Sequence, residues 1–280
     1  SCDPALEVAE GHLGLAAPNE DSLGGDNSSL GLVAKQIDVD RVFGLPLRAQ
    51  AGLKVQKGYR SSCSQSVPLA VARDDAFCFY YEENLAALKA AGFEIVEFSP
   101  VAGDTLPPDT HAVYFGGGYP ERFARELAGN MDLAAQLRRA AQLGMPIFGE
   151  RGGLIYLGRS LRGFDGRTYP MSGVLPVDFF LDPAYLQIRY IELTTCRDSL
   201  LGRAGTVLRG QEFHQFRVAR SELAPDFYTA KTSDGREFVD GYQRQNVVAS
   251  SAYIYLNSSP AAADSFYQAA VSWHRRRSLT

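Results

Sequence analysis

From Val67 to Leu157, short apolar runs alternate with segments whose apolar residues recur at helical spacing. The runs suited to buried strands are VPLAVA (67–72), FEIVEFS (93–99), HAVYF (111–115) and PIFGE (146–150). The helical segments between them are Glu82–Ala91, Phe123–Leu127 and Leu133–Leu143, and Gly92 and Gly144 stand at C-cap positions. This order predicts an α/β fold in which a mostly parallel sheet carries helices on both faces.

The last of these runs leads into a glycine-flanked turn, 148-FGERGGLIYLG-158, and a further helix is expected over Gly152–Leu157. A strand, a sharp turn and a helix are the layout with which many hydrolases present a nucleophile. Small residues beside the apex permit a tight turn with φ > 0. The apex residue is Arg151, which has five donors, keeps its charge at ordinary pH and has no electron pair for attack.

Two other features belong to the same candidate site, because functional groups gather at the carboxyl ends of parallel strands. Gly116–Gly118 follow the HAVYF run, and their amides are suited to binding an oxyanion, although a tight turn also explains the glycines. His214 ends the run QEFH (211–214) and is either a structural histidine or a catalytic one.

The second half of the chain is richer in strand patterns, and residues 1–65 are loosely organised. Strands are expected at Leu186–Leu193, Phe213–Ala219, Phe227–Thr232 and Asn246–Ile254, with a last helix over Phe266–Trp273. We expect residues 1–65 to form an N-terminal arm with one amphipathic helix within Leu30–Val42. Residues 66–280 form the main domain.

Composition excludes several functional classes. The net charge of −4 gives no global attraction to nucleic acid, and the basic run His274–Arg277 is interpreted as a solvated tail. The four cysteines form no CxxC pair, so neither a disulfide framework nor a metal site is expected. No apolar run reaches the roughly 18 residues of a membrane span. These features are typical of a reducing soluble compartment: the cytoplasm or, after removal of a targeting peptide, a plastid stroma or mitochondrial matrix.

Four ordered blocks resemble a known enzyme family, cobyrinic acid a,c-diamide synthase. They are RDDAFCFYYEENLAALKAAGFEIVEFSP, AVYFGGGYPERFARELAGN, CRDSLLGRAGTVLRGQEFH and NVVAS, and they match its C-terminal glutamine amidotransferase domain of the class I, triad-related type. The related nickel-sirohydrochlorin and hydrogenobyrinic acid diamide synthases share these blocks. The resemblance implies a flavodoxin-like class I amidotransferase fold with additional strands in the C-terminal half. EGHLGLAAPNE (10–20) resembles the end of the family's ATP-binding domain, so the arm is expected to be its remnant.

The resemblance also implies a chemistry. In the family, an elbow cysteine attacks the side-chain amide of glutamine, a histidine assists, and a glycine loop forms the oxyanion hole. The ammonia then travels to a P-loop domain, where ATP has activated two carboxylates of a tetrapyrrole. Gly117 and Gly118 match the oxyanion loop, His214 matches the catalytic histidine, and Arg151, after Glu150, stands at the cysteine position.

The sequence departs from the family at the residues that matter most. Without an elbow thiol the covalent acyl-enzyme route is lost. The pattern GxxxxGK[ST] does not occur in these 280 residues. Tyr253 and Tyr255 stand where the family usually has a His-x-His pair. Cys78 is either a surrogate nucleophile or a small, half-buried thiol.

We therefore predict a catalytically inactive amidotransferase-like domain, without cofactor, that serves as a structural or regulatory subunit among protein partners. In this hypothesis Arg151 forms a salt bridge with a carboxylate such as Glu150, Asp74, Asp75 or Glu212, since a buried guanidinium needs pairing. An alternative is a module that binds a tetrapyrrole or small carboxylate, with Arg151 as the anion anchor. A third hypothesis is an amidotransferase that works with a separate ATP-binding chain.

Overall fold

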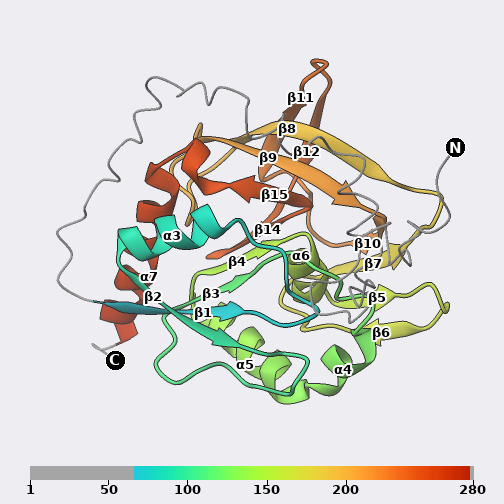
Figure 1. Cartoon of the computed structure of the whole chain (residues 1–280), viewed down its shortest axis with the longest axis horizontal. Coiled ribbons are helices and arrows are strands. Elements are labelled where there is room, and N and C mark those ends of the chain that lie inside the picture. The colour runs from blue at the N-terminus through green and yellow to red at the C-terminus, as the bar shows by residue number, and fades with distance from the viewer. Residues whose placement is uncertain (1–65, 278–280) are drawn as a thin grey trace, which may run out of the picture. The chain divides into compact units, whose positions relative to one another are not determined.

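The computed structural model describes residues 66–277, so the calls on the N-terminal arm lie outside the described residues. At the centre of this part is a six-stranded sheet with the order β13-β14-β4-β3-β1-β2 (Figure 1). Five strands are parallel, and β13 alone pairs antiparallel, with β14. The strands are β1 (Val67–Ala72), β2 (Phe93–Phe98), β3 (Ala112–Phe115), β4 (Ile147–Glu150), β13 (Tyr242–Arg244) and β14 (Val247–Ser250).

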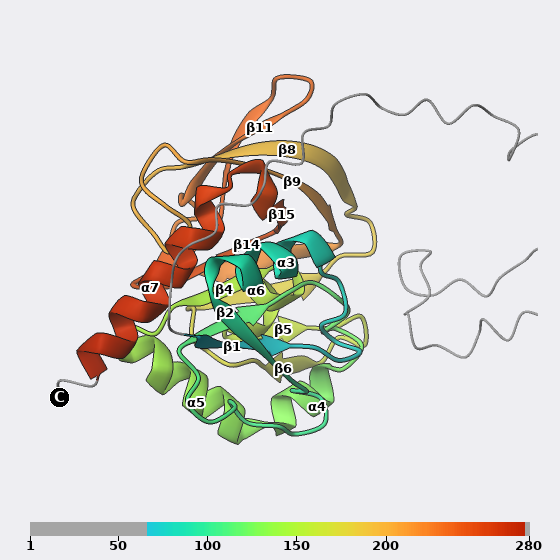
Figure 2. The ribbon, with the colours of Figure 1, turned by 60° about the vertical axis from the view of Figure 1, so that its left-hand side comes forward.

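Helices lie on both faces of this sheet (Figure 2). On one face are α3 (Glu82–Ala91) and the long C-terminal α7 (Ala261–Arg277), and on the other are α4 (Ala124–Gly129) and α5 (Met131–Gln142). The side chains of β1 alternate between the two faces of the sheet. Ala70 and Ala72 belong to one apolar core, and Leu69 and Val71 belong to the other. Burial on both faces explains why the inner strands β1 and β3 read as continuous apolar runs, whereas the edge strand β2 alternates with exposed glutamates.

The second half of the chain adds two further sheets. One has the order β10-β7-β5-β6 and the other β12-β11-β8-β9-β15. Their strands are β5 (Ser160–Arg162), β6 (Thr168–Pro170), β7 (Val177–Leu181), β8 (Gln187–Thr195), β9 (Val207–His214), β10 (Phe216–Ser221), β11 (Tyr228–Thr232), β12 (Glu237–Asp240) and β15 (Ala252–Tyr255), and a short 3-10 turn, η4 (Leu256–Ser258), precedes α7. The predicted fold class, a mostly parallel sheet with extra C-terminal strands, is therefore confirmed.

The first half follows the sequence prediction closely, and the second half does not. β1, α3 and α6 (Gly152–Leu157) have the expected bounds, and Gly92 ends α3 with φ 117°. The single strand expected over Phe213–Ala219 is wrong, because the chain leaves β9 at Gln215 and begins β10 in another sheet. Similarly, Asn246–Ile254 contains two strands that belong to different sheets. No helix within residues 66–277 is long and apolar enough to cross a membrane.

Candidate functional site

The glycine-flanked turn forms the sharp elbow that the sequence predicts. Arg151 lies between β4 and α6 with φ 43° and ψ −94°, a conformation that non-glycine residues rarely adopt. The neighbouring glycines are needed for packing: a Cβ at Gly149 would lie 2.7 Å from the Leu157 side chain, and one at Gly153 would overlap the Phe115 carbonyl. The elbow is thus held against β3 by close backbone contact, and its strained apex is fixed by its surroundings.

The Arg151 side chain is turned inward, and only 3% of the residue is exposed. Its Nε donates a 2.6 Å hydrogen bond to the Phe213 carbonyl, and its Nη1 donates to the Gly118 carbonyl. Burial lowers the pKa of the guanidinium, but the nearby Tyr253 and Glu121 side chains outweigh that effect, so the pKa is raised. The elbow residue therefore joins the glycine loop to β9.

The expectation that Arg151 forms a salt bridge is wrong for the part of the chain that the structure describes, where no carboxylate oxygen lies within 4.0 Å of it. Three of the carboxylates proposed as partners, Glu150, Asp74 and Glu212, accept hydrogen bonds from other groups. Asp74 accepts hydrogen bonds from Ser99 Oγ and from the amides of Ala76 and Val101. Main-chain carbonyls and the Tyr253 side chain supply the polar partners that a buried guanidinium needs.

The glycine loop lies beside the elbow, as expected, but its amides are not all available. The Gly117 amide donates to the Phe79 carbonyl at 3.1 Å, and Phe79 N donates back to Gly117 at 3.0 Å. Gly118 accepts from Arg151 through its carbonyl, and its φ of 149° brings it against the Ala76 backbone. A Cβ at Gly117 would overlap the ring of Tyr253. Side-chain-free positions are thus used for close packing within the protein.

Glu150 is buried at the end of β4 and connects the two largest sheets. Its carboxylate accepts hydrogen bonds from the Tyr114 hydroxyl at 2.5 Å and from the Ile254 amide at 2.7 Å. Burial raises the pKa of the Glu150 carboxyl to about 7, although both hydrogen bonds act in the opposite direction. This residue therefore holds β15 on the end of β4, next to the elbow.

His214 lies on the opposite face of β9 from the Arg151 contacts. In the antiparallel pair β15 and β9, Tyr253 is opposite Gln211, so these two side chains share one face. Because side chains alternate along a strand, Glu212 and His214 project to the other face. The structure thus brings Arg151, Gly117 and Gly118 together, whereas Tyr253, and not His214, meets the guanidinium.

On its own face, His214 belongs to a second polar cluster. Its Nδ1 is 3.2 Å from the Phe216 carbonyl, and its Nε2 is 3.8 Å from Glu212 Oε1. Burial alone would raise the pKa of Glu212, but hydrogen bonds from His214, Arg189 and Ser251 lower it to about 2. This cluster lines a cavity of about 390 Å³. The arrangement fixes the histidine ring within the protein by contacts that need no ligand.

Cys78 lies close to the elbow and is half-buried. Burial raises the pKa of its thiol to about 11, with Arg151 as a weaker opposing influence. Because the thiolate is the nucleophilic form, this raised pKa disfavours Cys78 as a nucleophile near neutral pH.

Tyr253 is the residue whose importance sequence reasoning underestimated. Its ring lies against Gly117 and meets the Phe79 ring edge-on, with centroids 6.3 Å apart. The sequence singles out Tyr253 because it stands where the family usually has a histidine of the His-x-His pair. The sequence does not show which face of β15 carries the tyrosine, because that depends on the pairing of β15 with β9.

The chain is similar to known proteins over most of its length. Residues 68–261 match the family model described as the CobB/CobQ-like glutamine amidotransferase domain. The chain is similar to the cobyrinate a,c-diamide synthase of Syntrophotalea carbinolica, with 34% identity over 261 residues that cover 91% of this chain and 57% of that protein. The enzyme of the same name from Streptococcus sanguinis is 37% identical over 255 residues, which cover 89% and 55%. The chain therefore spans less than two thirds of these relatives.

Among solved structures, a glutamine amidotransferase superimposes with a TM-score of 0.50 at 18% sequence identity. The match covers 72% of this chain and 98% of that one. At this level of identity the similarity supports the fold alone.

Proposed function

Because the chain belongs to the CobB/CobQ-like glutamine amidotransferase domain family, we propose that it is a catalytically inactive amidotransferase-like domain that serves as a structural or regulatory subunit of a larger assembly. The observation that carries the proposal is the elbow side chain, a buried guanidinium bonded to two main-chain carbonyls. Amide hydrolysis through an acyl-enzyme needs a nucleophile at this point, and arginine has no electron pair to offer.

The glycine loop supports the same conclusion. An oxyanion hole requires amides that point at the position where negative charge develops. The Gly117 amide instead donates to Phe79, and the Tyr253 ring packs on Gly117. The space beside the elbow is thus filled by side chains of this protein.

Cys78 gives little support to an active enzyme with a displaced nucleophile. Its thiol is half-buried and has a pKa raised to about 11. Within residues 66–277, the charged groups that act on it are Arg151, Asp74 and Asp75, and His214 faces the other side of β9. An amidotransferase that works with a separate ATP-binding chain would still need a nucleophile, so this hypothesis is less well supported.

The binding-module hypothesis is also weakened at its anchor. Arg151 is 3% exposed and has its Nε and Nη1 donors engaged by the Phe213 and Gly118 carbonyls. A tetrapyrrole or small carboxylate would have to replace these internal bonds. A structural role needs no such rearrangement, because the same bonds already connect the elbow, the glycine loop and β9.

Ammonia release from glutamine tests the proposal directly. The purified chain is expected to release no ammonia above the buffer background in a coupled glutamate dehydrogenase assay, with an active family member as the positive control. Glutamine turnover that disappears in the variant Cys78→Ser would show that the chain is an enzyme and overturn the inactivity.

The subunit role has a separate test. Native purification of the tagged full chain from its own cells, followed by mass spectrometry and light scattering, should recover a stoichiometric complex with other proteins. A monomer without partners at its natural abundance would refute the subunit role and leave the question of activity to the ammonia assay.

A further inference from the structure

A smaller cavity lies at the opposite end of the parallel strands from Arg151. It has a volume of about 80 Å³ and is lined by Arg138, Gln142, Gly173, Arg244, Gln245 and Val247, among others. Val247 begins β14, so the cavity lies where the strands start, whereas the elbow lies where they end. We refer to it as the two-arginine cavity.

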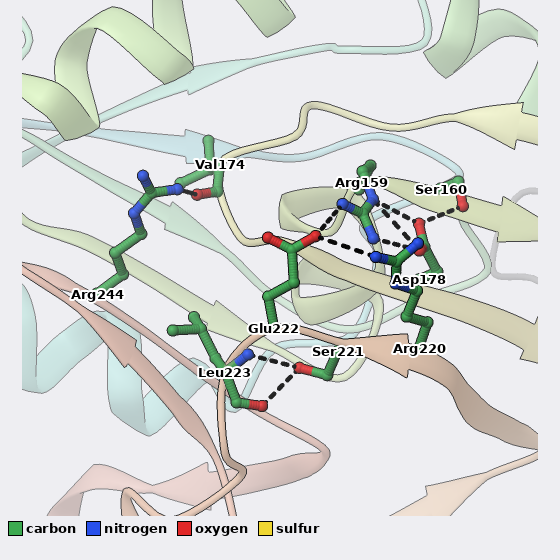
Figure 3. Close-up of polar contacts among 9 residues, drawn as sticks. All are labelled: Arg159, Ser160, Val174, Asp178, Arg220, Ser221, Glu222, Leu223 and Arg244. Carbon is green, nitrogen blue, oxygen red and sulfur yellow. Dashed lines mark hydrogen bonds and ion pairs between the residues drawn. The ribbon is translucent and has the colours of Figure 1, made fainter.

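Both arginines are held by the loop that crosses between them. Arg138, on α5, donates from Nη1 to the Ser172 carbonyl at 2.7 Å. Arg244, on β13, donates from Nη1 to the Val174 carbonyl at 3.1 Å, as Figure 3 shows. These bonds hold each guanidinium in place but use one of its five N–H donors. Two exposed cations from separate elements therefore meet at one surface cavity, each oriented by one bond to the main chain and with donors to spare.

Within the part of the chain that the structure describes, neither arginine has an acidic partner. Within residues 66–277, no carboxylate oxygen lies within 4.0 Å of the Arg138 or Arg244 guanidinium. The neighbouring surface is different: Arg159 pairs with Asp178 at 2.6 Å, and Glu222 lies 3.9 Å from Arg220 (Figure 3). Among the described residues that line the cavity there is no aspartate or glutamate. Two positive charges thus face the cavity without internal neutralisation.

The rest of the lining fits a small, hydrogen-bonding anion. Gln142 and Gln245 add amide groups, and Gly173 has no side chain where a Cβ would lie 3.8 Å from Arg138 Nη1. One water molecule takes up about 30 Å³ of liquid, so a cavity of about 80 Å³ accommodates a compact group larger than water. Guanidinium groups recognise phosphate oxygens in a planar, often bidentate arrangement.

We propose that the two-arginine cavity binds a phosphate dianion, either as free inorganic phosphate or as the terminal phosphoryl group of a small ester. The two fixed positive charges match the two negative charges of the dianion, and the amides supply further donors to its oxygens. The cavity is separated from the elbow by the length of the parallel strands, so this binding does not depend on whether the amidotransferase site is active.

Isothermal titration calorimetry of the full chain with inorganic phosphate, in a buffer without other polyvalent anions, tests the proposal. Saturable binding with one site is expected, and it should weaken as sodium chloride is raised. The variants Arg138→Gln and Arg244→Gln should each weaken it roughly tenfold or more, because each removes charge-assisted hydrogen bonds. Arg139→Gln is the matched control, since Arg139 is exposed like Arg138 and lies next to it on the same helix but does not line the cavity.

Two further titrations, with adenosine monophosphate and adenosine, distinguish the sources. Tighter binding of the monophosphate than of phosphate, with no binding of adenosine, assigns the site to a phosphoryl ester. Equal affinities for phosphate and the monophosphate assign it to free phosphate. The proposal is overturned if phosphate shows no saturable binding in the millimolar range. It is also overturned if Arg139→Gln weakens binding as much as the two cavity variants, because the effect would then be one of general charge.

Discussion

Replacing Arg151 by methionine tests the structural role of the elbow side chain. Methionine is also long and unbranched, so the variant leaves little empty space but removes the charge and the donors. The Phe213 and Gly118 carbonyls would then be buried without these donors, and each such loss costs about 1–3 kcal/mol. Relief from burying a charge offsets part of this sum. We expect the free energy of unfolding to fall by about 2–4 kcal/mol.

Urea denaturation followed by circular dichroism measures this change. Arg125→Met on α4 is the control, because Arg125 is exposed and its replacement should stay within about 0.5 kcal/mol of the wild type. A variant Arg151→Met as stable as the control would refute the reasoning that the guanidinium holds the loop and β9 together. Arg151→Gly should be more stable than Arg151→Ala by about 1 kcal/mol, since only glycine adopts φ 43° without strain.

Three further results are expected. Cys78, with a thiol pKa raised to about 11, should react with iodoacetamide far more slowly at pH 7 than the exposed Cys196. Peptide mass spectrometry measures both rates, and equal rates would contradict the burial of Cys78. The folded-state pKa of Glu150 is raised from 4.5 to about 7, so folding favours the protonated carboxyl and the protein loses stability as pH rises through this range. The variant Glu150→Gln should flatten this fall in the free energy of unfolding by up to about 3 kcal/mol. An unchanged pH profile would contradict the raised pKa. The pH dependence from Glu212 has the opposite sign, because its folded-state pKa of about 2 gives stability above pH 4.5 that is lost on acidification. In urea titrations between pH 2 and 5, the variant Glu212→Gln should lose this part of the acid sensitivity. Acid sensitivity equal to that of the wild type would show that the charge of Glu212 does not stabilise the cluster around His214.

The parallel half of the fold was accessible from the sequence because its signals are local. The strands β1, β3, β4 and β14 are buried almost throughout and read as short apolar runs, whereas the edge strand β2 exposes two glutamates. Gly92 marks the end of α3, where a left-handed residue is required. Several later strands, such as β8, β10 and β11, are half-exposed, and at two points the chain changes sheet across a single residue. Gln215 and Ser251 separate strands of different sheets, and no local pattern distinguishes such a break from a continuous strand.

The sequence by itself determined the family, the α/β class, the elbow with φ > 0 and the arginine at its apex, because these depend on residue type and near neighbours. Only the tertiary structure decided what that arginine contacts. Its partners come from Gly118, Phe213 and Tyr253, which lie 33, 62 and 102 positions away in the sequence, and β-strand register sets which side chains face it. A shift of one residue between β9 and β15 would exchange the faces of Tyr253 and its neighbours. For that reason the sequence identified His214 as a candidate site residue but could not show which face of β9 carries its side chain.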